Sequence, residues 1–159
     1  MMPVILVAGV QGSGKSWVCR QLTDKFRYVP HDRCWTHPLQ SPGEGLDAAW
    51  GPPGSKSTHV AEILRAATES TLPVLTEAPF GERQLRDELT KAGLKVTVVF
   101  IVEDASTLTR RFRNREGKSL PDGALTRAAG LQKRAIDWGC FWGSSEQVLG
   151  HLKTQKISN

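Results

Sequence analysis

Short apolar runs alternate with amphipathic stretches along most of the chain of 159 residues. The apolar runs are rich in Val, Ile, Leu and Phe, which is typical of buried strands. They predict strands at 3–8, 26–30, 73–78, 95–102 and 140–142. Between them, apolar side chains recur three and four positions apart, the spacing of one helix face. We therefore expect helices over 14–26, 58–70, 82–92, from Asp104 to Gly117, over 125–138 and from Ser144 onward.

Several helix ends carry their own signals. Asp104 suits an N-cap, since its carboxylate can accept a bond from a free backbone N–H of the first turn. Ser144 and Gln147 have the spacing of a capping box, and Gly93 is a C-terminal stop. Residues 31–57 are different, because Pro and Gly interrupt every pattern there. A loop of this length inside a compact domain is usually functional or mobile.

The alternation of strands and helices predicts an α/β fold, with a parallel sheet and helices on both faces. The length fits one domain, 1–159. Ligands of such sheets bind at the carboxyl ends of the strands. Gly9, Asp32 and Glu77 each lie at the end of a predicted strand or just after it. We therefore expect these three residues to meet in one cleft.

The segment Gly9–Ser16 fits the phosphate-binding P-loop pattern G-x-x-x-x-G-K-[ST], and it lies between a predicted strand and a predicted helix. Its glycines let the backbone wrap a phosphate chain, while its N–H groups point at anionic oxygens. Lys15 can reach the β- and γ-phosphates, and Ser16 can offer its hydroxyl to Mg²⁺. The pattern predicts ATP and Mg²⁺ as ligands, with contacts from Gly9, Gln11, Gly12, Ser13, Gly14, Lys15 and Ser16.

Phosphoryl transfer also needs a second metal-site group, a base and positive charge on the phosphates. Glu77 is the candidate for the metal site, although it could be an ordinary strand-end carboxylate. Asp32 is the candidate catalytic base, the alternative being a turn Asp with local hydrogen bonds. Its neighbour His31 could do similar work. Arg111 and Arg115 share a helix face and could both bind the triphosphate.

Positive charge is concentrated in one segment. The whole chain has a formal net charge of +5, yet residues 110–134 hold eight Lys or Arg residues against two acidic ones, a net charge of +6. This segment overlaps the part predicted to close over the phosphates as a basic helical lid, about 104–122. Arg110 and Arg113 fall on other helix faces than Arg111, where they are solvated or contact a polymer backbone.

The predicted acceptor-binding loop, about 31–57, contains two of the five tryptophans, Trp35 and Trp50. They either stack on a base of the substrate or anchor the loop to the body of the protein. Trp17 and Trp138 are expected to be packing residues. By position, 143–145 after the last predicted strand are candidates for contacts to adenine.

Composition excludes some classes of protein. The chain has no apolar run of 18 residues, so we expect no transmembrane helix, and we expect its first residues to form a core strand and not a signal peptide. Its three cysteines, at positions 19, 34 and 140, are widely spaced, which predicts reduced thiols and no zinc site. We expect a cytoplasmic protein with no membrane association and no obligate protein partner.

Three patches together resemble the kinase domain of phage polynucleotide kinase and its P-loop kinase relatives. They are the P-loop, the region of Asp32, and the segment R-F-R-N-R-E-G-K-S-L-P from Arg111 to Pro121, with an Arg four residues before a second Arg and a Pro six residues further. The resemblance implies Lys15 and Ser16 on ATP and Mg²⁺, Asp32 as the base, and Arg111 and Arg115 as lid arginines. It spans roughly residues 3–135.

One position departs from that family. Polynucleotide 5′-kinases commonly carry an Arg three residues after the catalytic Asp, where this chain has Trp35, although Arg33 is nearer. A tryptophan there could stack on a base, as would suit phage kinases that phosphorylate 5-hydroxymethyluracil within DNA. Arg33, Trp35 and Trp50, with Asp32, are therefore the candidate substrate residues. The acceptor is a hydroxyl of a nucleic acid or, alternatively, of a small molecule. A third hypothesis is a nucleotide-dependent binding switch.

Overall fold

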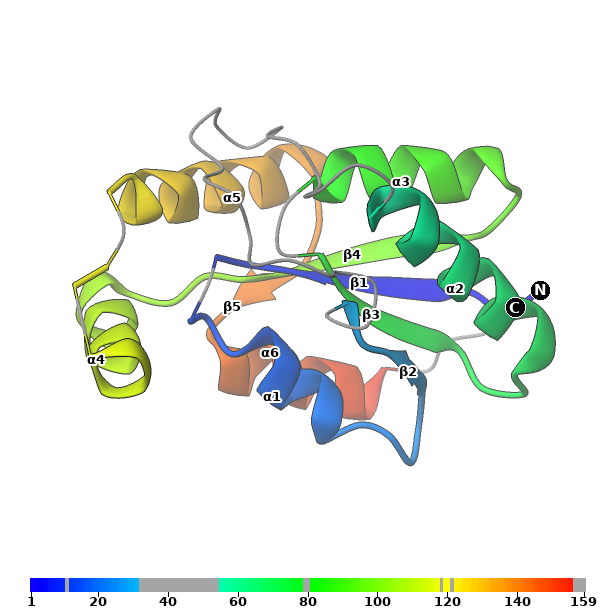
Figure 1. Cartoon of the computed structure of the whole chain (residues 1–159), viewed down its shortest axis with the longest axis horizontal. Helices are drawn as coiled ribbons and strands as arrows, with labels where there is room; N and C mark the ends of the chain where they lie inside the picture. Colours follow the sequence, from blue (N-terminus) through cyan, green and yellow to red (C-terminus); the bar gives the residue numbers. More distant parts are fainter. Residues whose placement is uncertain (11, 32–54, 79–80, 118, 121, 156–159) are drawn as a thin grey trace.

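The computed structural model describes residues 1–10, 12–31, 55–78, 81–117, 119–120 and 122–155. Its centre is a sheet of five parallel strands in the order β2-β3-β1-β4-β5 (Figure 1). This confirms the α/β class and the parallel sheet. The strands are β1 (Val4–Ala8), β2 (Arg27–Val29), β3 (Val74–Ala78), β4 (Val96–Ile101) and β5 (Trp142–Gly143).

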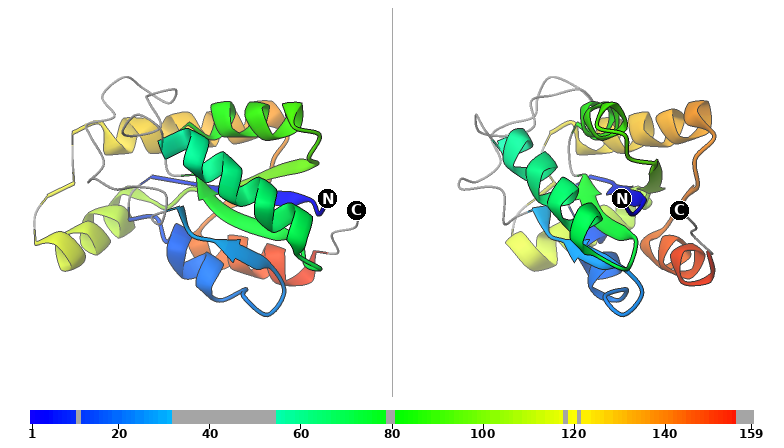
Figure 2. Two further views of the ribbon diagram at one scale, coloured as in Figure 1. Left: turned by 45° about the vertical axis from the view of Figure 1, so that its right-hand side comes forward. Right: turned by 90° about the vertical axis from the view of Figure 1, so that its right-hand side faces the viewer.

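Helices cover both faces of the sheet, as predicted. They are α1 (Lys15–Arg20), α2 (Ser55–Glu69), α3 (Glu82–Lys91), α4 (Ala105–Glu116), α5 (Ala124–Trp138) and α6 (Ser145–Thr154). Helices α2, α3 and α5 pack on one face, and α1 and α6 pack on the other (Figures 1 and 2). Helix α4 lies beyond the carboxyl ends of the strands, beside the turn that joins β1 to α1.

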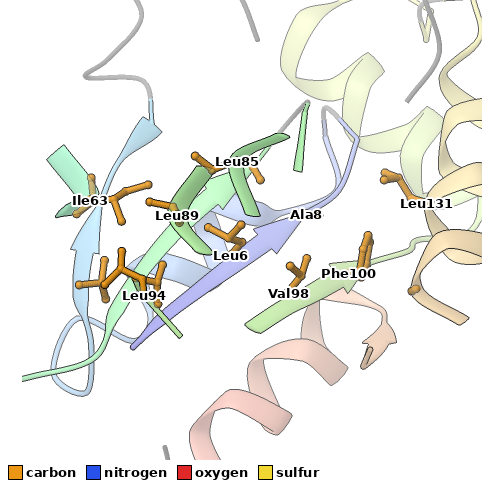
Figure 3. Close-up of a cluster of buried hydrophobic side chains, with 14 of the residues drawn as sticks. Leu6, Ala8, Ile63, Leu85, Leu89, Leu94, Val98, Phe100 and Leu131 are labelled. Carbon is orange, nitrogen blue, oxygen red and sulfur yellow. The ribbon is translucent and has the colours of Figure 1, made fainter. Parts of the chain in front are cut away.

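Each face of the sheet has its own hydrophobic core, because successive side chains of a strand point to opposite sides. On one side Leu6 and Phe100 pack with Ile63, Leu85 and Leu131 from the helices (Figure 3). On the other side β1 contributes Ile5 and Val7, and α1 and α6 contribute Val18, Leu22, Val148 and Leu152. All five residues of β1 are buried, so the strand that leads into the P-loop is held in place by packing along its whole length.

Helices α3 and α5 are joined by a buried polar contact. Arg134 donates a hydrogen bond of 2.5 Å to Glu82, which is only 1% exposed. Burial raises the pKa of the Glu82 carboxyl, although the hydrogen bond from Arg134 opposes that shift. Beside this pair, the guanidinium of Arg86 lies 3.7 Å from the ring centre of Trp138, which packs edge-on against Phe100.

The predicted helix caps are present. The Asp104 carboxylate accepts a bond of 2.7 Å from Thr107 N, and Ser144 and Gln147 form a complete capping box at the start of α6. Gly93, with φ of 91°, follows the end of α3. The sequence thus predicted these ends correctly, because each one depends on neighbours along the chain.

Three predicted boundaries were wrong. Helix α1 ends at Arg20, where the prediction continued to residue 26, and turns follow it. Six more helical residues would carry the chain about 9 Å further along the helix axis, whereas Phe26 is buried in the second core and β2 starts at once. Strand β5 is shifted to Trp142–Gly143, because the N–H of Cys140 still bonds to Ala135 O at the end of α5 and pairing with β4 begins only at Trp142. Helix α2 begins three residues earlier than predicted, at Ser55.

The two tryptophans expected to pack behave differently. Trp138 packs on Phe100, as predicted, but Trp17 is 45% exposed. The prediction for Trp17 was wrong because the buried residues of α1 are Lys15, Val18 and Cys19, and Trp17 lies outside this buried face. In the described part of the chain, no helix is long and apolar enough to cross a membrane.

Candidate active site

The P-loop follows the central strand β1 and bends through two glycines in the left-handed region. Gly12 has φ of 84° and Gly14 has φ of 100°, a conformation that side chains with a Cβ rarely adopt. Gly9 has no room for a side chain, since a Cβ there would lie 2.5 Å from Ser13 Oγ. The glycines of the motif are therefore required by the path of the loop. Gln11 lies outside the described residues.

The side chain of Lys15 reaches back across the P-loop. Its Nζ donates a hydrogen bond of 2.8 Å to Val10 O, and the residue is 8% exposed. Burial lowers the pKa of Lys15 from its ordinary value of 10.5 to about 8, and Glu77 partly opposes this shift. The charges of Arg115 and Arg127 lower the same pKa further. Burial and the two arginines therefore outweigh the one carboxylate, Glu77, in their effect on Lys15, and the negative charge of a phosphate would stabilise the ammonium group.

Glu77, in β3, is the carboxylate of this site. It lies opposite Val7 of β1 in the sheet and is 2% exposed. One of its oxygens accepts a bond of 2.5 Å from Ser16 Oγ. The other accepts bonds from Tyr28 Oη at 2.5 Å and from His31 N at 3.3 Å. Three elements therefore fix Glu77 beside the hydroxyl that the motif assigns to Mg²⁺.

Arg111 extends from α4 to the P-loop. Its Nη1 donates a hydrogen bond of 3.1 Å to Ser13 O, and its Nη2 donates one of 3.3 Å to Ser145 Oγ. Glu103 Oε1 is 3.6 Å from Arg111 Nη1. The structure thus places this predicted lid arginine at the phosphate loop.

The other arginines of α4 divide as the helical spacing predicts. Arg115 lies close enough to Lys15 for its charge to lower the lysine pKa. Arg110 and Arg113 line a surface hollow of about 430 Å³, together with Ala105, Ser106, Thr109 and Asn114. Arg127 of α5 influences the pKa values of both Lys15 and Glu82, so it belongs to the same charged region.

Four predicted substrate residues, Asp32, Arg33, Trp35 and Trp50, lie outside the described residues. Their predicted roles stay predictions. Their neighbour His31 contributes a backbone N–H to Glu77, and its ring centre lies 6.2 Å from that of His59. His59 is buried and its Nε2 lies 2.8 Å from Thr76 Oγ1, next to Glu77 in the sequence. Burial lowers the pKa of His59 to about 3, so this imidazole is neutral at physiological pH.

Sequence reasoning missed Tyr28 and Glu103. Glu103 follows the end of β4, so the rule that selected Glu77 from a strand end also applied to it. Nothing in the sequence signals the bond from Tyr28 to Glu77, because it depends on the pairing of β2 with β3. Ser145, one of the positional candidates for an adenine contact, lies next to Arg111 and the P-loop, and its predicted contact with adenine stays a prediction.

The residues present fit ATP and Mg²⁺. Ser13 Oγ is buried in the loop and has no hydrogen-bond partner among the described residues, so an oxygen of a phosphate group would give it one. The buried ammonium of Lys15 and the guanidinium of Arg111 flank the same loop. The hydroxyl of Ser16 and the carboxylate of Glu77 are the kind of oxygen ligands that Mg²⁺ takes, directly or through water.

The shifted pKa of Lys15 predicts how nucleotide affinity depends on pH. Phosphate favours the charged lysine, so above pH 8 binding must be accompanied by uptake of a proton. We expect affinity for ATP to weaken as pH rises from 8, by up to about tenfold per pH unit. Fluorescence titration with a labelled ATP analogue between pH 7 and 9.5 measures this. A K15A variant should show a flat profile, and an equal decline in that variant would assign the effect to another group.

No protein-family model and no curated protein matches the sequence. Solved structures do match. A gluconokinase from Sinorhizobium meliloti 1021 is 25% identical, with a TM-score of 0.53, over 81% of this chain and 74% of that one. A sugar kinase from Janibacter sp. HTCC2649 is 18% identical, with a TM-score of 0.60, over 97% and 94%. Shikimate kinase from Acinetobacter baumannii is 15% identical, with a TM-score of 0.54, over 99% and 97%.

These neighbours are P-loop kinases, and the chain shares their fold: one small α/β domain with a five-stranded parallel sheet. The P-loop and the groups around it occur at the carboxyl ends of the strands, where the fold binds its ligands. Fold and site together are those of an ATP-dependent kinase.

Proposed function

We propose that the chain transfers the γ-phosphate of ATP to a hydroxyl on a nucleic acid, either a hydroxymethylated base in DNA or a 5′-OH end. The observation that carries the donor half is the meeting of Lys15, Glu77 and Arg111 around one phosphate loop. Lys15 and Arg111 supply positive charge to the phosphate oxygens. Asp32, in its predicted role, accepts the proton of the acceptor hydroxyl and orients that oxygen.

Ser16 and Glu77 would hold Mg²⁺, which neutralises charge on the β- and γ-phosphates when it is bound. The hydrogen bond between Ser16 and Glu77 keeps their oxygens together before the metal arrives. Tyr28 and His31 N fix the second oxygen of Glu77, so that its carboxylate has one orientation. Such support of a metal-site group typically changes metal affinity or activity by about 10- to 100-fold.

The surface of α4 supports a polyanionic acceptor. The hollow of about 430 Å³ contains two arginines, two hydroxyls and an amide, all of which suit phosphate oxygens. It lies on the helix that also brings Arg111 to the P-loop, so a strand bound there would be held by the same element that reaches the donor site. Stacking by Trp35 and Trp50 would then hold a base near Asp32, as an enzyme that modifies a hydroxymethylated base of phage DNA requires.

A small-molecule acceptor is the second candidate, because the structural neighbours include a gluconokinase, a sugar kinase and a shikimate kinase. An acceptor panel separates the two. Labelled ATP is offered with 5′-OH DNA, hydroxymethyluracil-containing DNA, nucleosides, gluconate and shikimate. We expect label in one of the DNA substrates. Label confined to a small molecule would overturn the nucleic-acid proposal while confirming phosphotransfer.

Removal of Arg110 and Arg113 tests the same proposal by a different route. In R110A/R113A we expect the KM for DNA to rise about tenfold or more, and the slope of log affinity against log salt to fall by about 2. R65A/K91A, which removes two exposed charges from other helices, is the matched control. Equal salt slopes in both variants would show that the surface of α4 does not bind the acceptor.

A further inference from the structure

The P-loop contacts two elements that are distant from it in sequence. A Cβ on Gly14 would lie 3.1 Å from Ser145 Cβ and 3.4 Å from Arg111 Nη1. The loop, the start of α6 and the middle of α4 are therefore in direct contact. Among the described residues, Arg111 donates two hydrogen bonds, both at this junction, to Ser13 O and Ser145 Oγ.

Glu103 is the anionic group of this junction. It follows the end of β4 by two residues, so the sheet fixes its backbone. Its side chain is only 7% exposed, and its Oε1 accepts a bond of 2.6 Å from Ser145 N. That N–H is in the first turn of α6, where the helix itself offers no acceptor. The same oxygen is 3.6 Å from Arg111 Nη1. One carboxylate oxygen thus faces the backbone of α6 and the guanidinium of α4.

We propose that Glu103 is a positioning residue that holds the guanidinium of Arg111 against the P-loop before nucleotide binds. The proposal rests on the proposed function, in which Arg111 binds the phosphates. The two hydrogen-bond acceptors of Arg111 are neutral, and Arg111 itself is 36% exposed. The nearby carboxylate therefore supplies the charge that keeps a long side chain in one conformation.

A guanidinium that is already ordered loses less conformational entropy when phosphate arrives, so affinity and rate both gain. Removal of the Glu103 charge should release Arg111 without removing it. We expect about a fivefold weaker affinity for ATP, and a similar decrease in kcat, in E103Q. The amide oxygen of the new side chain can still accept the bond from Ser145 N. The anchor of α6 should therefore survive, and the melting temperature should stay close to that of the unchanged protein.

The double-mutant cycle with R111A is the decisive experiment. Affinity is measured with a fluorescent ATP analogue and turnover with labelled ATP in E103Q, R111A and E103Q/R111A. If Glu103 acts through Arg111, then E103Q has no further effect once Arg111 is absent. Additive effects in the double variant, or an E103Q variant with unchanged affinity and rate, would overturn the proposal.

Hydrogen exchange of nucleotide-free protein gives a readout that does not depend on activity. We expect faster exchange of the α4 amides in E103Q, because without the Glu103 charge Arg111 no longer holds α4 firmly against the P-loop. E146Q is the matched control, since Glu146 is exposed in the same first turn of α6. Equal exchange of α4 in E103Q and the unchanged protein would overturn the proposal. A fully active R111A variant would instead contradict the role of Arg111 in the proposed function, which distinguishes the two failures.

Discussion

Lys15→Ala is expected to lower the rate of phosphate transfer by about 10²- to 10³-fold, the usual effect of removing one charged or hydrogen-bonding group at a reacting centre. The ammonium of Lys15 is buried, bonded to Val10 O, and reaches the centre of the loop. The small methyl group of alanine leaves the phosphates without this charge. Transfer of label from ATP measures the rate, and titration with a fluorescent ATP analogue measures how well the loop still binds ATP.

The fold should survive this change. Below pH 8 the charged form of Lys15 is buried at a cost in stability, and this cost decreases between pH 8 and 10.5, where the unfolded chain still holds the proton that the folded one has lost. Truncation therefore removes a buried charge along with a hydrogen bond, and we expect a similar melting temperature at pH 7. K91A, at an exposed position of α3, is the control. Near-normal transfer in K15A would show that ATP is not bound by this loop.

Glu77→Gln is expected to raise the Mg²⁺ concentration needed for half-maximal transfer by about 10- to 100-fold. The amide can keep hydrogen bonds to Ser16 and Tyr28, since both hydroxyls also accept bonds. The variant therefore isolates the loss of charge. Transfer rates measured over a range of Mg²⁺ concentrations test this, and high Mg²⁺ should restore part of the rate.

The same variant should shift the pH profile of nucleotide binding. Glu77 raises the pKa of Lys15, so without its charge the lysine loses its proton at a pH below 8. Affinity for ATP should then begin to weaken at a lower pH than in the unchanged protein. E69Q, with an exposed carboxylate at the end of α2, is the control. A lower melting temperature with an unchanged Mg²⁺ requirement and pH profile would mean that Glu77 only anchors Tyr28.

Sequence reasoning was most accurate where the information is local. The caps at Asp104 and Ser144 depend on residues three positions away, and the P-loop is a contiguous motif between a strand and a helix. It also selected Glu77 and Arg111, because a strand end and a helix face could be inferred from periodicity. The structure brings both to the P-loop.

The remaining features depend on contacts between distant segments. Tyr28 meets Glu77 only because β2 pairs with β3, and Glu103 meets Arg111 only because α4 folds back beside the P-loop. The early end of α1 has a similar cause. The chain turns there to bury Phe26, and Lys25 then donates hydrogen bonds to Leu152 O and Lys153 O at the end of α6. The periodicity of apolar residues along the chain does not indicate which distant segments come into contact.

In the part of the chain that the structure describes, the sheet ends on both sides in very short strands, with three residues in β2 and two in β5. Backbone groups at a sheet edge are a template on which another chain can add a strand, and a short edge gives such an addition few hydrogen bonds. The interior strands β1, β3 and β4, which are longer and mostly buried, are enclosed between these two edges. The order of the strands therefore protects the folded protein from edge-to-edge aggregation. A chain whose edge strands detach would expose β3 and β4 and lose that protection.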